Sequence, residues 1–178
     1  LRIRADDAAS RLPFGAKYGC LEGEIAGLIE ACADRNIRLC GVAFHVGSGA
    51  RSPKAFADAV ALSKRVFDLY TMLRPHATPL DVLDVGGGFC GGFSDDGNAA
   101  VSASGDCTVV DALNAALATY FPETEYPSLQ IIAEPGRYFA EASAALCCRV
   151  VGSRSRELVS NDNRREERQC WISDGVYG

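Results

Sequence analysis

The chain has 178 residues, of which 48% are hydrophobic and 23% are charged, and its formal net charge is −5. This balance is typical of a soluble globular protein and excludes disordered, collagen-like and coiled-coil chains. No basic stripe runs along the sequence, so nucleic acid is not an expected partner. No apolar run approaches the roughly 20 residues that span a bilayer, and we expect no membrane segment.

Four short apolar segments have the composition of buried strands. Residues 1–3 are interpreted as the end of a strand. The other three segments are residues 39–46, 80–85 and 129–133, and each leads into glycine. Because short apolar runs bounded by glycine are typical of strands covered on both faces, these segments predict a parallel sheet.

Apolar residues at helical spacing separate the predicted strands. They predict helices over residues 21–36, 53–73 and 109–120. Ser52 precedes Pro53 and has the position of an N-cap. The alternation of strand and helix predicts an α/β fold.

The pattern changes near residue 140, where we place a domain boundary between residues 1–140 and residues 141–178. The second of these domains is expected to begin a β-rich unit. Within it, the charged run 149–168 is predicted to be a solvated loop, and residues 170–177 are predicted to be two strands joined by an Asp-Gly turn. A polar insertion is expected at residues 91–106.

The eight cysteines include no Cys-x-x-Cys pair, so neither a structural zinc site nor a thioredoxin-like motif is predicted. Several of them lie in apolar runs, where a thiol behaves as a small hydrophobic group. We therefore expect reduced thiols in a cytoplasmic protein. Secretion with disulfide bridges is the alternative.

Polar and glycine residues follow the three internal strands at the positions where parallel α/β folds carry function. Glycine amides approach an anion without a Cβ in the way, and arginine is a forked donor that suits phosphate. Each group alone is more often structural, as a tight turn, a surface ion pair, a buried histidine or a helix cap. Their occurrence at three consecutive strand ends favours a functional site. The candidates are His45, Ser48, Gly86, Gly87, Gly88, Glu134 and Arg137.

Three motifs carry a family resemblance. They are FHVGSG at 44–49, LDVGGGF at 83–89 and AEPGRY at 133–138. Together they resemble the pyridoxal-phosphate-dependent decarboxylases of the alanine-racemase-like fold, and among these the ornithine decarboxylases. FGA at 14–16 and DGVYG at 174–178 support this group over the diaminopimelate decarboxylases. The resemblance implies the C-terminal half of a (β/α)8 TIM-type barrel, followed by the start of a β-rich domain.

The resemblance also implies pyridoxal 5'-phosphate as the cofactor and a role for each motif residue. The two catalytic candidates are His45, which would stack on the pyridine ring, and Glu134, which would pair with the ring nitrogen. A carboxylate at that nitrogen keeps it protonated, and a protonated ring withdraws electrons. No metal site is predicted. The implied cofactor-binding set is Arg2, His45, Ser48, Gly86, Gly87, Gly88, Glu134 and Arg137, with Ser48, Gly87, Gly88 and Arg137 at the phosphate.

The implied activity is that of a lyase that converts L-ornithine to putrescine and carbon dioxide in polyamine biosynthesis, as a cytoplasmic homodimer. The family's cofactor-bearing lysine would precede residue 1. Its catalytic cysteine and substrate-binding aspartate would follow residue 178. We therefore expect this chain to be an internal part of the enzyme and to be inactive by itself.

The chain departs from the family pattern at two points. The lysine that normally precedes the Phe-Gly-Ala motif is absent from 11–13, after a shortened loop at 6–10, and Cys90 replaces a proline. These departures motivate one alternative, an inactive paralogue of the antizyme-inhibitor kind that acts by binding an antizyme-like regulator. The intact cofactor-binding set argues against it. A lysine or arginine decarboxylase is a further alternative, because the residues that select the substrate lie outside this chain.

Overall fold

The computed structural model describes residues 1–91, 108–141, 143–144, 147–160 and 163–174. These residues divide into two compact units, Leu1–Ser143 and Ala144–Gly178. The assignment of the two units as separate domains stays a prediction.

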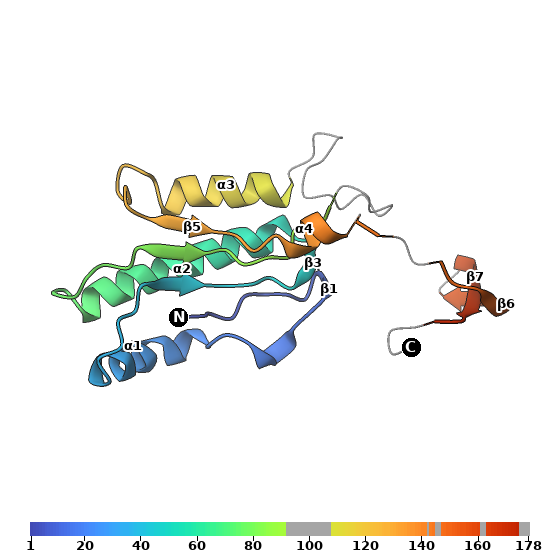
Figure 1. Cartoon of the computed structure of the whole chain (residues 1–178), viewed down its shortest axis with the longest axis horizontal. Helices are drawn as coiled ribbons and strands as arrows, with labels where there is room; N and C mark the ends of the chain where they lie inside the picture. The colour runs from blue at the N-terminus through green and yellow to red at the C-terminus, as the bar shows by residue number, and fades with distance from the viewer. Residues whose placement is uncertain (92–107, 142, 145–146, 161–162, 175–178) are drawn as a thin grey trace. The chain divides into compact units, whose positions relative to one another are not determined.

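A three-stranded parallel sheet forms the centre of the first unit (Figure 1). It consists of β2 (Gly41–Ala43), β4 (Val82–Asp84) and β5 (Gln130–Ile132), with β4 in the middle. Arg2 makes a parallel bridge to Ala43, so the N-terminal residues lie beside β2. The predicted parallel sheet and the mixed α/β architecture are therefore confirmed, although each strand is shorter than the apolar run that predicted it.

Three helices connect the strands and lie where the apolar spacing predicts them. They are α1 (Ile25–Asp34), α2 (Pro53–Leu73) and α3 (Val109–Tyr120). The hydroxyl of Ser52 accepts a hydrogen bond from the amide of Ala55, which confirms the predicted N-cap of α2. Figure 1 shows α2 running behind the sheet, along the direction of its strands.

The chain through β2 and β4 alternates between a buried and a more accessible face, as the period of two requires, whereas all three residues of β5 are exposed. Phe44 and Val46 follow β2 on the buried face, where they pack with Leu83 of β4 and with apolar side chains of α2. Ala43 and His45 point to the other face and are half-buried. The sheet thereby presents the side chains of alternate residues away from the helices.

Three short elements of the first unit, namely β1, β3 and α4, are not predicted by the sequence pattern. A short antiparallel pair joins β1 (Ser10–Leu12) to β3 (Ser48–Ala50), with Leu12 opposite Ser48. A five-residue helix, α4 (Gly136–Ala140), follows β5. Segments of three to five residues are too short to display a period, so none of them gives a clear pattern.

The second unit contains an antiparallel hairpin of β6 (Val150–Ser160) and β7 (Asn163–Ile172). The prediction of a solvated loop over 149–168 is therefore wrong. The residues of this run form the two strands instead, with Arg156 opposite Glu167 and Glu157 opposite Glu166. The strand predicted after the Asp-Gly turn, at residues 176–177, lies outside the described residues. So does most of the polar insertion predicted at 91–106.

The cysteines in the described part of the chain are free thiols: Cys20, Cys32, Cys40, Cys90, Cys147, Cys148 and Cys170. Burial raises the pKa of the Cys90 thiol, and the nearby carboxylate of Glu141 adds to this effect. In the same part of the chain, none of the helices has the length and apolar character needed to cross a membrane.

Candidate functional site

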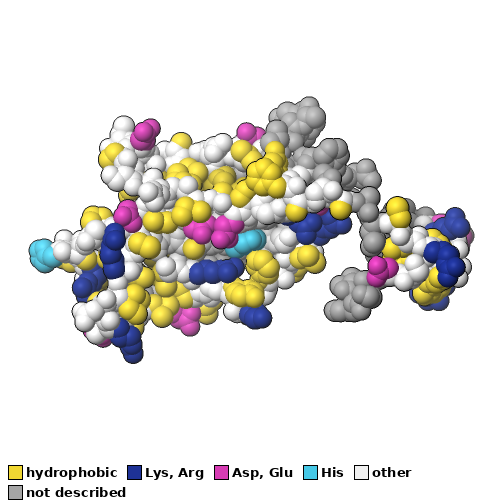
Figure 2. All heavy atoms as spheres, in the orientation of Figure 1, with side chains coloured by type: hydrophobic (Ala, Val, Ile, Leu, Met, Phe, Trp, Pro, Cys, Tyr) yellow, Lys and Arg dark blue, Asp and Glu magenta, His cyan; other side chains and the backbone are white. Residues whose placement is uncertain are grey.

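The carboxyl ends of β2, β4 and β5 bring the predicted site residues to one end of the sheet (Figure 1). His45 follows the end of β2 by two residues, and Glu134 follows the end of β5 by two residues. Because strand side chains alternate, both lie on the face of the sheet that the helices leave accessible. Figure 2 shows basic, histidine and acidic side chains side by side in the middle of a face over these strands.

Gly87 fills the space between His45 and Glu134. A Cβ atom at position 87 would lie 2.5 Å from the carbonyl oxygen of Glu134 and 3.0 Å from Nε2 of His45. The amide of Glu134 also donates a 2.8 Å hydrogen bond to the carbonyl of Gly86. Only glycine therefore allows the backbone after β4 to lie against both neighbours.

The flanking glycines are required for a second reason, which is backbone conformation. Gly86 and Gly88 have φ angles of +64° and +103°, a region that favours glycine. A Cβ at Gly88 would lie 2.3 Å from the carbonyl of Gly47, in the loop after β2. The glycine turn thus brings the main chain close to the loops on either side of it.

Aromatic and cationic side chains surround the imidazole of His45. The edge of the Phe14 ring packs on it with ring centroids 4.8 Å apart, and Nδ1 accepts a 3.1 Å hydrogen bond from the amide of Gly47. The guanidinium of Arg2 lies 4.8 Å from the centre of the Tyr18 ring and 5.9 Å from that of Phe14. Arg2 is therefore held beside the imidazole by two aromatic rings.

The surroundings of His45 favour the neutral imidazole. Burial lowers its pKa most, and the positive charge of Arg2 lowers the pKa further. The carboxylates of Glu134 and Asp84 act in the opposite direction, but the net shift is downward. The ring is therefore uncharged near neutral pH and can pack against a flat apolar or aromatic surface.

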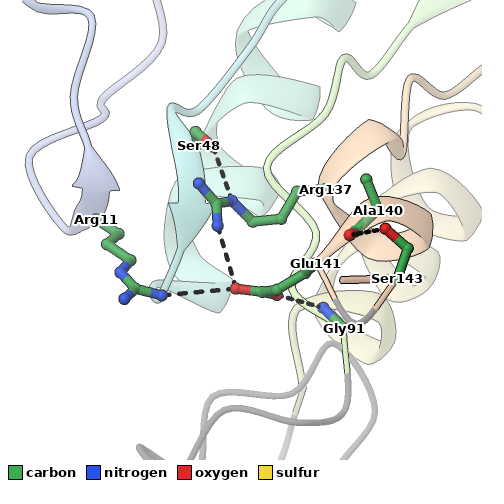
Figure 3. Close-up of polar contacts among 7 residues, drawn as sticks. All are labelled: Arg11, Ser48, Gly91, Arg137, Ala140, Glu141 and Ser143. Carbon is green, nitrogen blue, oxygen red and sulfur yellow. Dashed lines mark hydrogen bonds and ion pairs between the residues drawn. The ribbon is translucent and has the colours of Figure 1, made fainter. Parts of the chain in front are cut away.

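Ser48 and Arg137 meet at the edge of the glycine turn. The Nε of Arg137 donates a 2.9 Å hydrogen bond to Oγ of Ser48, and its Nη1 donates to Glu141 at 3.1 Å (Figure 3). The side chain of Arg137 is 25% exposed, so its charge is only partly screened by water. A guanidinium with five N–H donors keeps further donors for an anion after making these two bonds.

All of the predicted site residues lie at this end of the sheet or beside it. His45, the glycine turn and Glu134 lie together, and Ser48 contacts Arg137. The charge of Arg2 lowers the pKa of His45. The sequence patterns assign no site role to five residues that take part, namely Arg11, Phe14, Tyr18, Asp84 and Glu141. Glu141 lies one helical turn after Arg137, a spacing that identifies it once α4 is known. Phe14 and Asp84 lie within the motifs at 14–16 and 83–89, whereas Arg11 and Tyr18 have no comparable signal in the sequence.

The donor set fits a ring that carries a phosphate group. The Arg137 guanidinium, the Ser48 hydroxyl and the glycine amides are all groups that bind phosphate oxygens. Beside these donors, the main chain at Gly87 lies against the imidazole of His45 and the backbone carbonyl of Glu134. These features place an anion-binding group next to a site for a flat ring.

The chain is similar to proteins of one known family. Residues 1–141 match the family model described as pyridoxal-dependent decarboxylase, pyridoxal binding domain. A probable ornithine decarboxylase from Dictyostelium discoideum is 36% identical over the whole chain, which spans 37% of that protein. A chloroplastic ornithine decarboxylase from Nicotiana glutinosa is 37% identical over 97% of the chain, and the match spans 34% of its length.

Two further similarities bear on the alternatives. The solved arginine decarboxylase of Paramecium bursaria Chlorella virus superposes with a TM-score of 0.70 at 36% identity, over 88% of this chain and 38% of that one. Antizyme inhibitor 2 from Xenopus laevis is 33% identical over the whole chain, which spans 37% of that protein. The chain thus corresponds to somewhat more than a third of each of these proteins.

Proposed function

This chain belongs to the pyridoxal-dependent decarboxylase family, and we propose that the whole protein decarboxylates L-ornithine to putrescine and carbon dioxide. The observation that carries the proposal is the gathering of a phosphate-type donor set and a His–Gly–Glu cluster at one end of the sheet. In this reaction the bond between Cα and the carboxyl carbon breaks, and a proton takes the place of the departing carbon dioxide.

Pyridoxal 5'-phosphate is the proposed cofactor, held through its phosphate group and its ring nitrogen. Ser48, Arg137 and the amides of the glycine turn bind the phosphate, which anchors the cofactor and leaves its aldehyde end to react. When bound, the cofactor supplies an electron-withdrawing ring that accepts the electron pair of the broken bond. Arg2, whose guanidinium packs on Phe14 and Tyr18, would be a further cofactor-binding residue in this assignment.

Glu134 and His45 have distinct proposed tasks. The carboxylate of Glu134 holds a proton on the ring nitrogen, because a negative charge beside that nitrogen raises its pKa. The neutral imidazole of His45 packs on the ring face and excludes water from it. Its lowered pKa supports this task, since a charged imidazolium would repel a protonated pyridine ring.

The parallel sheet is proposed to be part of a (β/α)8 barrel. Support comes from β5, whose residues Ile131 and Ile132 are 49% and 44% exposed at an edge of the sheet. Apolar side chains at the edge of a parallel sheet are normally covered by further strands and helices. The assignments of 1–140 to the barrel and 141–178 to a β-rich domain belong to the same proposal. The homodimeric state and the cytoplasmic location are proposed from the family resemblance.

Two observations favour alternative functions. The missing lysine before Phe14, together with the similarity to an antizyme inhibitor, favours a non-catalytic protein that binds an antizyme-like regulator. The structural similarity to an arginine decarboxylase favours the same chemistry on a different amino acid, with lysine as a third possible substrate.

The deciding experiment uses the full-length protein. It is titrated with pyridoxal phosphate while visible absorbance is recorded, and carbon dioxide release is then measured with L-ornithine, L-lysine and L-arginine. We expect cofactor binding and a ratio kcat/KM that is highest for ornithine. A higher ratio for lysine or arginine would transfer the function to that substrate. Absence of cofactor binding, with capture of an antizyme, would support the inhibitor instead.

A further inference from the structure

One carboxylate next to the phosphate site joins three separate elements. Oε1 of Glu141 accepts the 3.1 Å hydrogen bond from Arg137 and lies 3.5 Å from Nη1 of Arg11 in β1. Its Oε2 accepts a 3.0 Å hydrogen bond from the amide of Gly91, in the chain after β4. Figure 3 shows these contacts converging on the single side chain of Glu141.

The burial of this cluster makes its central ion pair effective. The side chain of Glu141 is 17% exposed, whereas that of Arg11 is 54% exposed. Exposed ion pairs contribute little, so the contact with Arg11 is the weaker of the two. The contact with Arg137 is largely withdrawn from water and limits where its guanidinium can lie. Two guanidinium groups share one carboxylate, so the cluster keeps a net positive charge for an anion.

The contact with Gly91 fixes the backbone as well. A Cβ at Gly91 would lie 3.2 Å from the carbonyl oxygen of Tyr138, so the chain after the glycine turn packs closely on α4. Glu141 thereby connects α4, which carries Arg137, to the chain segment that contains the amides of the glycine turn. Ser48 then holds the guanidinium from the other side, through Nε.

We propose that Glu141 is a positioning residue of the phosphate site, which holds Arg137 and the chain after the glycine turn in the geometry that binds phosphate. The inference rests on the proposed cofactor-binding function. It concerns a residue that touches neither the ring nor the phosphate in that assignment. Its effect should therefore depend on the phosphate group of the ligand and on the presence of Arg137.

The test compares two ligands on full-length protein, namely pyridoxal phosphate and pyridoxal, which lacks the phosphate. The Glu141→Ala variant should bind pyridoxal phosphate about tenfold more weakly, because Arg137 loses its hydrogen bond to a charged group. Binding of pyridoxal should change less than twofold. Glu141→Gln keeps the size and one oxygen acceptor, so its affinity for pyridoxal phosphate should be intermediate. Glu30→Ala, at an exposed position of α1, is the matched control.

General loosening of the fold predicts a different result, because it would weaken both ligands equally. An equal loss for the two ligands, or unchanged affinity for pyridoxal phosphate, would overturn the inference. If Glu141→Ala does not fold, Glu141→Gln decides by the same comparison.

The variant Arg137→Ala separates this inference from the proposed function. It should weaken binding of pyridoxal phosphate, and adding Glu141→Gln to it should have no further effect. If Arg137→Ala leaves the affinity unchanged, the proposed phosphate site is wrong. If it weakens binding but Glu141→Gln causes the same loss with and without Arg137, only the positioning role is wrong.

Discussion

Arg137 donates a hydrogen bond to Ser48 across a sequence separation of 89 residues, from α4 to β3. The contact joins the end of the last strand of the sheet to the loop that follows the first. It therefore depends on the correct order of all three strands. An anion bound at this point would be held by groups that follow the two edge strands of the described sheet, β2 and β5.

Replacing Ser48 with alanine should weaken the binding of pyridoxal phosphate to the full-length protein. The change removes the hydroxyl that would donate to the phosphate and that accepts a hydrogen bond from Arg137. Hydrogen bonds to charged groups contribute about 1.5–3 kcal/mol, which corresponds to tenfold to a hundredfold in affinity. Fluorescence titration measures the effect, with the exposed residue Ser128→Ala as the control. An unchanged dissociation constant would show that Ser48 does not contact the phosphate.

Gly87→Ala should be far more damaging than Gly27→Ala, an alanine introduced at a glycine in open space. The added Cβ would lie 2.5 Å from the carbonyl oxygen of Glu134, a backbone atom that cannot move aside without shifting β5. We expect loss of cofactor binding in full-length protein that is still folded by circular dichroism. Gly27→Ala in α1 meets no atom within 4 Å and should stabilise the helix by about 0.8–1 kcal/mol. Equal behaviour of the two variants would contradict the packing described at Gly87.

Glu134→Ala should abolish most turnover while the cofactor stays bound. The carboxylate acts on the ring nitrogen and not on the phosphate, so its removal affects electron withdrawal more than anchoring. Loss of a group that holds a proton at the reacting ring costs about a hundredfold or more in kcat. Steady-state rates and bound-cofactor absorbance, measured on one preparation, separate the two effects. Unchanged turnover would refute the role assigned to Glu134.

Stability of the full-length apoprotein should fall on acidification because of His45. Its pKa is lowered in the folded state, first by burial and then by Arg2, whereas the unfolded imidazole titrates near 6.5. Below that pH the unfolded chain binds more protons than the folded chain, so unfolding becomes easier as pH falls toward the folded pKa. The free energy of unfolding in urea should differ less between pH 7.5 and pH 5.5 for His45→Gln than for wild type. The matched control is His76→Gln, which removes an exposed imidazole. If stability changes with pH as much in His45→Gln as in wild type, the prediction is wrong.

The elements predicted from sequence are those that bury apolar side chains in a regular pattern. The strands at 41–43 and 82–84 lie within apolar runs, and α2 begins at the predicted cap on Ser52. The hairpin of β6 and β7 was missed because charged residues such as Arg156 and Glu167 pair across its strands, so it lacks an alternation of apolar and polar positions. Hydrophobic periodicity detects burial, and a strand whose sides are both polar gives no such signal.

The candidate site could be predicted as a set of residues but not as a network. His45, Glu134 and Arg137 follow strand ends, which is a position that sequence reveals. The partners that hold them do not. The pairing of β1 with β3 brings the chain around β1 close to the site. Phe14 then contacts His45, and Arg11 lies near Glu141. Contacts created by short antiparallel pairs depend on tertiary packing, which local patterns do not record.

The hydrogen bond from the Gly47 amide to Nδ1 of His45 determines the tautomer of the imidazole. Because Nδ1 accepts, the neutral ring carries its single proton on Nε2, the atom that faces Gly87. A second proton would have to bind Nδ1 and would then meet the Gly47 N–H, donor against donor. Protonation would therefore break the hydrogen bond to Gly47, the residue immediately before Ser48, so the charge of the ring is coupled to a contact of the anion-binding loop.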